Sequence, residues 1–248
     1  MANIDSVTKN KLTIKADSSE RSYKIGLLML GLPLVLLSGC LHPAVMIVSF
    51  AIPMLVFFSR RDDPILRAGA EGEDMAIEML KQLPEDYTIF NQVKIPNEKS
   101  KTGYNETDII ISGPTAIFLL EVKHNKGHVY GSEQDARWQV VKVGRAGTSH
   151  VSSMRSPVKQ VKGDVWHLSN HLKNKKAKPW IQGIVLFTNP QVLLSMSGET
   201  SVPVFQSSDI LDYIVNFNTK INTKTSRPTI VEKSTNELMR LKNGSVFM

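Results

Sequence analysis

The chain has 248 residues, of which 42% are hydrophobic and 21% are charged, and it carries a formal net charge of +7. This length suits one globular domain with extensions and leaves no room for two domains of full size. The positive charge fits a partner with phosphate groups, either nucleic acid or anionic lipid headgroups. The single cysteine, Cys40, excludes an intramolecular disulfide and any zinc site built from several cysteines.

The N-terminal quarter contains a long uncharged run. Residues 1–24 are polar and of mixed charge, which is typical of a tail, but from Ile25 to Phe58 there is no Asp, Glu, Lys or Arg. One helix of that length would measure about 51 Å, well beyond the roughly 30 Å of a membrane's hydrocarbon core. A break at Leu41-His42-Pro43 divides the run into two spans, residues 25–41 and 44–58.

Basic residues flank this run on both sides, namely Arg21 and Lys24 before it and Arg60 and Arg61 after it. The positive-inside bias then places both ends in the cytoplasm, which only a hairpin satisfies. We therefore expect an N-terminal transmembrane helical hairpin over residues 25–59, in contact with membrane lipid through residues 25–58. It would hold the protein in the inner (cytoplasmic) membrane of a bacterium, with the soluble part facing the cytoplasm.

Other interpretations of this segment stay open. Each span is short and contains a proline, Pro33 or Pro53, so a re-entrant hairpin or a buried pair of core helices also fits. The stretch Leu37-Ser38-Gly39-Cys40 resembles a bacterial lipoprotein signal, in which Cys40 would be lipidated. The long polar tail before the run and the second apolar span after Cys40 argue against lipidation.

The soluble region extends over residues 60–218 and alternates helices with strands. In chain order, periodicity and turn residues predict a helix over 67–83, strands over 87–95, 108–111, 116–122 and 138–143, a helix over 157–172, a strand over 181–187 and a helix over 209–217. Residues 219–248 are a polar C-terminal tail with one weak helical stretch near 231–241. This order predicts a mixed α/β domain with helices on a central sheet.

Charged residues end one of the apolar strands. Glu121 and Lys123 follow the run Ile117-Phe118-Leu119-Leu120, and side chains two apart share one face of a strand. A hairpin turning at Gly113-Pro114 would bring Asp108 beside Glu121. Two adjacent carboxylates repel each other unless a cation lies between them, and ligands that are all oxygen suit Mg²⁺ or Mn²⁺. Lys123 would then stabilise charge on a phosphoryl group.

A Glu-x-Lys pair alone is weak evidence, because it arises by chance on solvated strands. Here it ends a buried strand, and ends of strands in α/β sheets are favoured places for sites. The sequence has no G-x-G-x-x-G, no phosphate loop with Gly-Lys-Ser/Thr and no Gly-x-Ser-x-Gly, so nucleotide hydrolysis and serine hydrolysis lack their usual motifs.

Further motifs occur in a fixed order around this pair. They are Gly69-Ala70-Glu71-Gly72-Glu73, Glu106-Thr107-Asp108-Ile109-Ile110-Ile111, Ala116 to Lys123, Lys126-Gly127-His128-Val129-Tyr130-Gly131, Trp138, Ser156-Pro157-Val158-Lys159-Gln160 and Ile184-Val185-Leu186-Phe187. The series resembles the nuclease-related domain (NERD), a branch of the PD-(D/E)xK nuclease superfamily. One departure is Thr107, which stands where the superfamily motif has proline.

The resemblance implies a restriction-endonuclease-like central mixed sheet flanked by helices. It implies that Asp108 and Glu121 are ligands of Mg²⁺ or Mn²⁺ and that Lys123 is the catalytic lysine. Glu73 would complete the metal shell, although it also fits a carboxylate that stabilises a helix N-terminus. Gln160 would position the substrate or the lysine, and a surface glutamine fits equally well. We expect Gly127 and Gly131 to shape a tight turn and Trp138 to lie in the core.

Basic residues follow the motif and are candidates for contact with a nucleic-acid backbone: Lys142, Arg145, Arg155 and Lys159. The run from Lys173 to Lys178 fits a solvated surface at least as well. We therefore expect a membrane-anchored, divalent-metal-dependent nuclease-like protein that hydrolyses phosphodiester bonds, with DNA as the substrate. The alternative is a catalytically weak or inactive module that binds or tethers nucleic acid in DNA processing or transfer.

Overall fold

The computed structural model describes residues 1–8, 10, 14, 64–144, 147–206, 208–220 and 227–244. The predicted membrane hairpin, Cys40 and Arg145 lie outside these residues. Among the residues that are described, no helix is long and apolar enough to cross a membrane. Residues 1–8 and 71–248 form one compact unit, and the candidate site lies within it.

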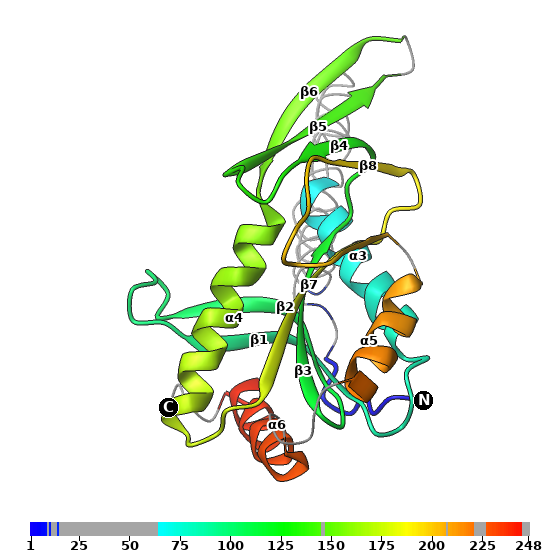
Figure 1. The fold of residues 1–248 in the computed structure, drawn as a ribbon. Coiled ribbons are helices and arrows are strands. Elements are labelled where there is room, and N and C mark those ends of the chain that lie inside the picture. Colours follow the sequence, from blue (N-terminus) through cyan, green and yellow to red (C-terminus); the bar gives the residue numbers. More distant parts are fainter. Residues whose placement is uncertain are drawn as a thin grey trace, which may run out of the picture. The chain divides into compact units, whose positions relative to one another are not determined.

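The described residues form the expected mixed α/β fold, with two sheets and flanking helices (Figure 1). The helices are α3 (Pro64–Leu80), α4 (Pro157–Asn174), α5 (Asp209–Lys220) and α6 (Pro228–Lys242). The strands are β1 (Thr88–Pro96), β2 (Tyr104–Ser112), β3 (Ala116–Lys123), β4 (Gly127–Gly131), β5 (Arg137–Val143), β6 (Ser149–Arg155), β7 (Trp180–Phe187), β8 (Val192–Met196) and β9 (Val204–Gln206).

The first sheet is mixed and has the strand order β1-β2-β3-β7-β9. Strands β1, β2 and β3 are antiparallel, whereas β3, β7 and β9 run parallel. The β2–β3 hairpin turns at Gly113-Pro114, as predicted, and pairs Ile109 with Leu120. Because β3 and β7 are parallel, the chain needs a crossover between them, and α4 lies on it.

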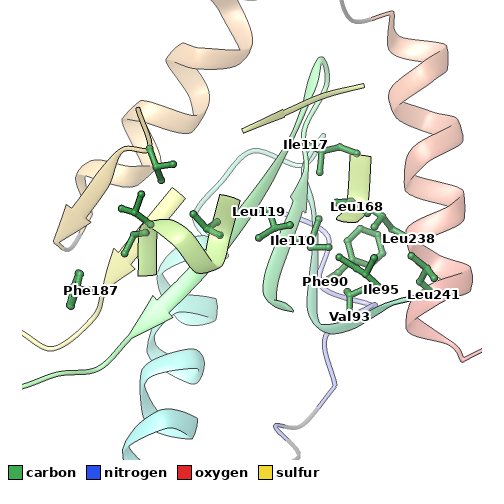
Figure 2. Close-up of a cluster of buried hydrophobic side chains, with 14 of the residues drawn as sticks. Phe90, Val93, Ile95, Ile110, Ile117, Leu119, Leu168, Phe187, Leu238 and Leu241 are labelled. Atoms are coloured by element: carbon green, nitrogen blue, oxygen red, sulfur yellow. The ribbon is translucent and has the colours of Figure 1, made fainter. Parts of the chain in front are cut away.

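Alternation along the strands divides the core into two clusters on opposite faces of this sheet. Ile109 and Phe118 pack with α3 and α5 on one face. Ile110 and Leu119 pack with α4 and α6 on the other face, and Figure 2 shows this second cluster. We call this second face the α4 face. Side chains at every second position of a strand share a face, so the α4 face continues from Leu119 to Glu121.

The second sheet has the strand order β6-β5-β4-β8. One of its faces joins the core cluster of the α4 face through Val129, Trp138 and Val140. Trp138 is fully buried and stacks on Phe187 at 6.4 Å between ring centroids, which confirms its predicted place in the core. Strand β6 has an almost wholly exposed polar sequence, so hydrophobic periodicity gives no signal for it.

The prediction of a tight turn at Gly127 and Gly131 is wrong, because these residues begin and end β4. Both positions require glycine for close packing instead. A Cβ atom at Gly131 would lie 2.3 Å from the Trp138 ring, and one at Gly127 would lie 2.4 Å from the Val141 carbonyl oxygen. Gly127 also has a φ of +97°, which L side chains rarely adopt.

The described parts of the two expected polar tails pack against the domain. At the N-terminus, Asn3 bridges to Thr88 of β1, and the Thr8 N–H donates to Asn91 Oδ1 at 3.0 Å. Near the C-terminus, the stretch near 231–241 with a weak helical signal lies within α6, which buries Leu238 and Leu241. A sparse apolar face is enough here because β1 and α4 supply the rest of the core.

Candidate functional site

Asp108 and Glu121 lie opposite each other on neighbouring strands. The last backbone pair of β2 and β3 at this end is Ile109 with Leu120, so the register places Asp108 across from Glu121. The Val122 N–H donates to Asp108 Oδ2 at 2.8 Å, which ties the carboxyl group of β2 to the backbone of β3. The hairpin expected from Gly113-Pro114 thus brings the two carboxyl groups together.

Lys123 shares the face of Glu121, as their spacing predicted. Its Nζ lies 2.5 Å from Glu121 Oε1, and both side chains are largely out of solvent. This pair places one ammonium group beside two carboxyl groups.

The pKa of Asp108 is raised well above its ordinary value. Burial is the main cause, because it disfavours the ionised form, and the charges of Glu121 and Glu73 add to it. The hydrogen bond from Val122 and the charge of Lys123 act in the opposite direction but do not cancel the shift. A buried carboxyl group with a strongly raised pKa among other carboxylates is typical of a functional site.

Glu73 on α3 also lies near Asp108, and it contacts Gln92, a residue that the sequence analysis did not single out. Gln92 Nε2 donates to Glu73 Oε2 at 3.1 Å, and both side chains are buried. Gln92 lies opposite Asp108 in the register of β1 and β2, and its φ is +48°. Strained backbone of this kind clusters at functional sites. Nothing in the sequence indicates this backbone conformation, because glutamine rarely adopts a positive φ.

Helix α4 brings polar side chains to the same region. Gln160, a predicted site residue, is half-buried, and Asp164 lies one turn further along the helix. Asn105 Nδ2 donates to Asp164 Oδ1 at 3.4 Å. Burial and then the charge of Glu121 raise the pKa of Asp164 to about 6, although Asn105 and Arg155 lower it. Sequence reasoning missed Asp164, and its spacing of four from Gln160 was the available signal.

Hydrogen bonds connect the end of β3 to the segment that follows β7. The Thr188 N–H donates to the Lys123 carbonyl oxygen at 3.0 Å, and His124 Nδ1 lies 2.9 Å from Thr188 Oγ1. Asn189 Nδ2 contacts the other ring nitrogen of His124 at 3.2 Å. A Cβ atom at Gly72 would lie 2.6 Å from His124 Cβ, so glycine lets α3 approach here. These contacts fix the backbone that carries Lys123.

The predicted basic residues are not gathered at one place. Arg155 ends β6 and is near enough to Asp164 to lower its pKa. Lys159 lies in the first turn of α4, where Nζ donates to the Gln134 carbonyl oxygen at 2.5 Å. Lys142 is exposed on β5 opposite His150, five residues along the strand from the pair of Arg137 with Arg155, or roughly 16 Å away.

Comparison with known families identifies this part of the chain. Residues 68–188 match the model of the nuclease-related domain. This segment of the chain belongs to that family. It contains Asp108, Glu121 and Lys123, and its limits agree within one residue with the resemblance from Gly69 to Phe187.

A relative in Bacillus anthracis gives no further functional information. An uncharacterized protein of that organism is 30% identical to this chain over 105 residues. The match covers 42% of this chain and 48% of the relative, so the chain spans about half of that protein's length. No solved structure matches the chain.

Proposed function

We propose that the protein is a divalent-metal-dependent phosphodiesterase that cleaves nucleic acid, with DNA as its substrate. The observation that carries this proposal is the buried carboxyl group of Asp108 opposite Glu121, with Lys123 on the same face. The match of residues 68–188 to the nuclease-related domain supports it. A central sheet of the restriction-endonuclease type belongs to the same proposal, because the candidate site lies on the adjacent strands β2 and β3 of a mixed sheet that is flanked by helices.

The donor set fits a small, hard cation. Asp108 and Glu121 offer only oxygen, and Mg²⁺ is commonly held by one or two carboxylates with water in its remaining positions. Among the described residues, no three His, Cys, Asp or Glu side chains are arranged to hold a metal ion between them. We therefore propose Asp108 and Glu121 as the direct ligands of Mg²⁺ or Mn²⁺, with Glu73 adding negative charge nearby.

The roles of the remaining residues follow from their positions. A bound divalent ion would polarise a phosphoryl oxygen and lower the pKa of a bound water. Lys123 would stabilise the negative charge that develops on the phosphoryl oxygens during cleavage. Gln160 would orient the substrate from α4, and Arg155, Lys159, Lys142 and Arg145 would contact its backbone.

We propose further that residues 25–58 tether this domain to a membrane. The support is the uncharged run itself, which is long enough for two short spans, and the basic residues at both of its ends. These residues lie outside the described part of the chain. The tether would confine cleavage to nucleic acid near the membrane surface.

A plasmid-nicking assay on the full chain tests the cleavage proposal. We expect nicking that needs Mg²⁺ or Mn²⁺ and stops with EDTA. Lys123→Ala should reduce the rate about 100-fold or more, in line with the loss of one charge-stabilising group. Lys126→Ala is the matched control, because Lys126 is exposed three residues further on and carries the same charge. Nicking that is unchanged in a folded Lys123→Ala variant contradicts the assignment.

One observation favours a second function, a module that binds nucleic acid without cleaving it. Lys123 Nζ is paired with Glu121 Oε1 at 2.5 Å and so competes with a metal ion for this carboxylate. Calorimetric titration of the full chain with MgCl₂ and MnCl₂ separates the two functions. Binding of nucleic acid with no uptake of either metal would favour the module, whereas metal uptake that disappears in Asp108→Asn supports the nuclease.

A further inference from the structure

A line of polar contacts runs from the candidate site along α4. Asp164, whose pKa responds to Glu121, accepts a hydrogen bond from Asn105 of β2. One turn further along the helix, His167 Nε2 lies 3.4 Å from Asn97 Nδ2, in the loop between β1 and β2. The distal part of the β1–β2 hairpin therefore lies beside the middle of α4 (Figure 1).

Trp166 is exposed at this place. It has 60% of its surface accessible, whereas Trp138 in the core has 0%. Its indole meets the His167 ring edge-on, at 4.8 Å between centroids and 83° between planes. At Gly163, one turn earlier on α4, a Cβ atom would meet nothing within 4 Å apart from the adjacent residues and backbone of its own helix, so the surface beside the indole is open. An indole that is mostly in water contributes little to folding, because few of its atoms pack against the core.

The charges around this indole suit phosphate groups. Lys99 and Lys101 are exposed in the loop between β1 and β2, next to Asn97, and Glu98 offsets one of them. Beyond the indole, Lys173 is exposed two turns further along α4. Lys162 contributes less, because it is paired with Glu133.

We propose that Trp166 is a stacking platform for a base of single-stranded nucleic acid, with Lys99 and Lys101 as phosphate contacts on the neighbouring hairpin. An exposed aromatic ring flanked by cations is the arrangement by which proteins hold single strands, since every unpaired base offers a face for stacking. A paired duplex keeps its bases stacked on one another. This inference rests on the proposed function in one respect, because it takes the bound strand to be the substrate of the site at Glu121.

The three tryptophans of the chain allow a direct optical test. Trp138 is buried and reports little, and Trp180, which is 45% exposed at the start of β7, serves as the matched control for Trp166. The full chain is titrated in EDTA, which prevents cleavage, with an oligothymidylate of twelve nucleotides and with a duplex of the same length. The single strand should quench tryptophan fluorescence in the Trp180→Phe variant and leave the Trp166→Phe variant almost unquenched.

Affinities measured by anisotropy of a labelled strand make the test quantitative. Trp166→Ala should weaken binding of the single strand roughly 5- to 100-fold, the range expected for loss of one stacked base. Trp166→Phe should retain part of the affinity, and Trp180→Ala should bind like the wild type. The double variant Lys99→Ala, Lys101→Ala should bind more weakly and with a smaller dependence on salt.

Three results would overturn the inference: equal quenching by duplex and single strand, quenching that persists in Trp166→Phe, or unchanged binding by Trp166→Ala. No quenching by any nucleic acid would point instead to a protein partner for this surface. The two proposals fail separately. Quenching through Trp166 without cleavage by the wild type rejects the nuclease but keeps the platform, and cleavage without such quenching rejects the platform alone.

Discussion

Two carboxyl groups in this domain are held where ionisation is unfavourable. Asp108 is buried and faces the charges of Glu121 and Glu73, and Asp164 is half-buried, where burial and then the charge of Glu121 disfavour its ionised form. Folding therefore disfavours the ionised form of each carboxyl group. Such carboxyl groups weaken folding but supply the negative charge that a metal ion or a proton-transfer step requires.

Asp164→Asn should therefore stabilise the folded chain at high pH. Folding raises the pKa of Asp164 from 3.8 to about 6, so its stabilising, protonated form is fully present below pH 4 and is lost as the pH rises through 6. We expect a gain of roughly 1–2 kcal/mol at pH 8, after allowance for partial exposure, and no gain at pH 4. Urea unfolding at both pH values measures it.

The exposed Asp86, in the turn before β1, provides the control, since Asp86→Asn should change stability equally little at both pH values. A loss of stability in Asp164→Asn that is the same at pH 4 and pH 8 would mean that its contact with Asn105, rather than its charge, matters most.

Among the elements, α4 connects most parts of the site. Its N-terminus follows Arg155, with Ser156 accepting a hydrogen bond from the Lys159 N–H as the helix cap. Its C-terminal half is held by α6, where Glu237 contacts His171 at 2.9 Å. The helix packs on β7, β3 and β1, so it sets where Gln160 and Asp164 lie relative to Glu121. The contact with α6 explains why the apparent tail belongs to the domain.

Alanine substitutions at two glycines should change the stability of the chain in opposite directions. Gly131→Ala should destabilise the chain by roughly 1–3 kcal/mol, because the methyl group would overlap the Trp138 ring and push it off Phe187. Gly163→Ala in α4 should stabilise it by roughly 1 kcal/mol, since the methyl group meets nothing and alanine favours helix. Urea unfolding monitored by circular dichroism measures both. Equal effects of the two substitutions would show that the packing around Trp138 adapts freely.

At the scale of the whole molecule, one chain combines a nuclease-related domain at residues 68–188 with a long uncharged run before it. Residues 1–8 return to the edge of β1, although they precede that run in the sequence. A hairpin that keeps both of its ends on one side of a membrane permits this return, because residues 1–8 and the domain then lie in the same compartment.

A membrane hairpin predicts how the full chain fractionates. The wild-type chain and Cys40→Ser should both sediment with membranes, resist extraction by alkaline carbonate and be released by detergent, because two apolar spans hold the chain without a lipid. If Cys40→Ser becomes soluble, the lipoprotein alternative is correct and the hairpin is wrong. Arg substitutions at Leu34 and Val48 should release the chain under the hairpin model, because a charge inside a span is costly.

The pair of strands that carries the site could be predicted from local sequence patterns. Asp108, Glu121 and Lys123 lie within 16 positions of one another, so a hairpin turn and the two-residue period of a strand suffice to bring them together. The core position of Trp138 and the order of the main helices followed from the same local rules. The match to the nuclease-related domain agrees with that local pattern.

The surroundings of those three residues, in contrast, depend on contacts between segments that are far apart in the sequence. Gln92 has a left-handed backbone conformation, which cannot be predicted from its residue type. Asp164 and Thr188 belong to segments that are more than 40 positions away from Glu121 in the sequence. The burial of α6, Ala2 and Ser6 likewise depends on contacts with segments that are far away in the sequence. Local patterns report which face of an element is apolar, but the partner that covers that face is fixed by contacts between distant segments.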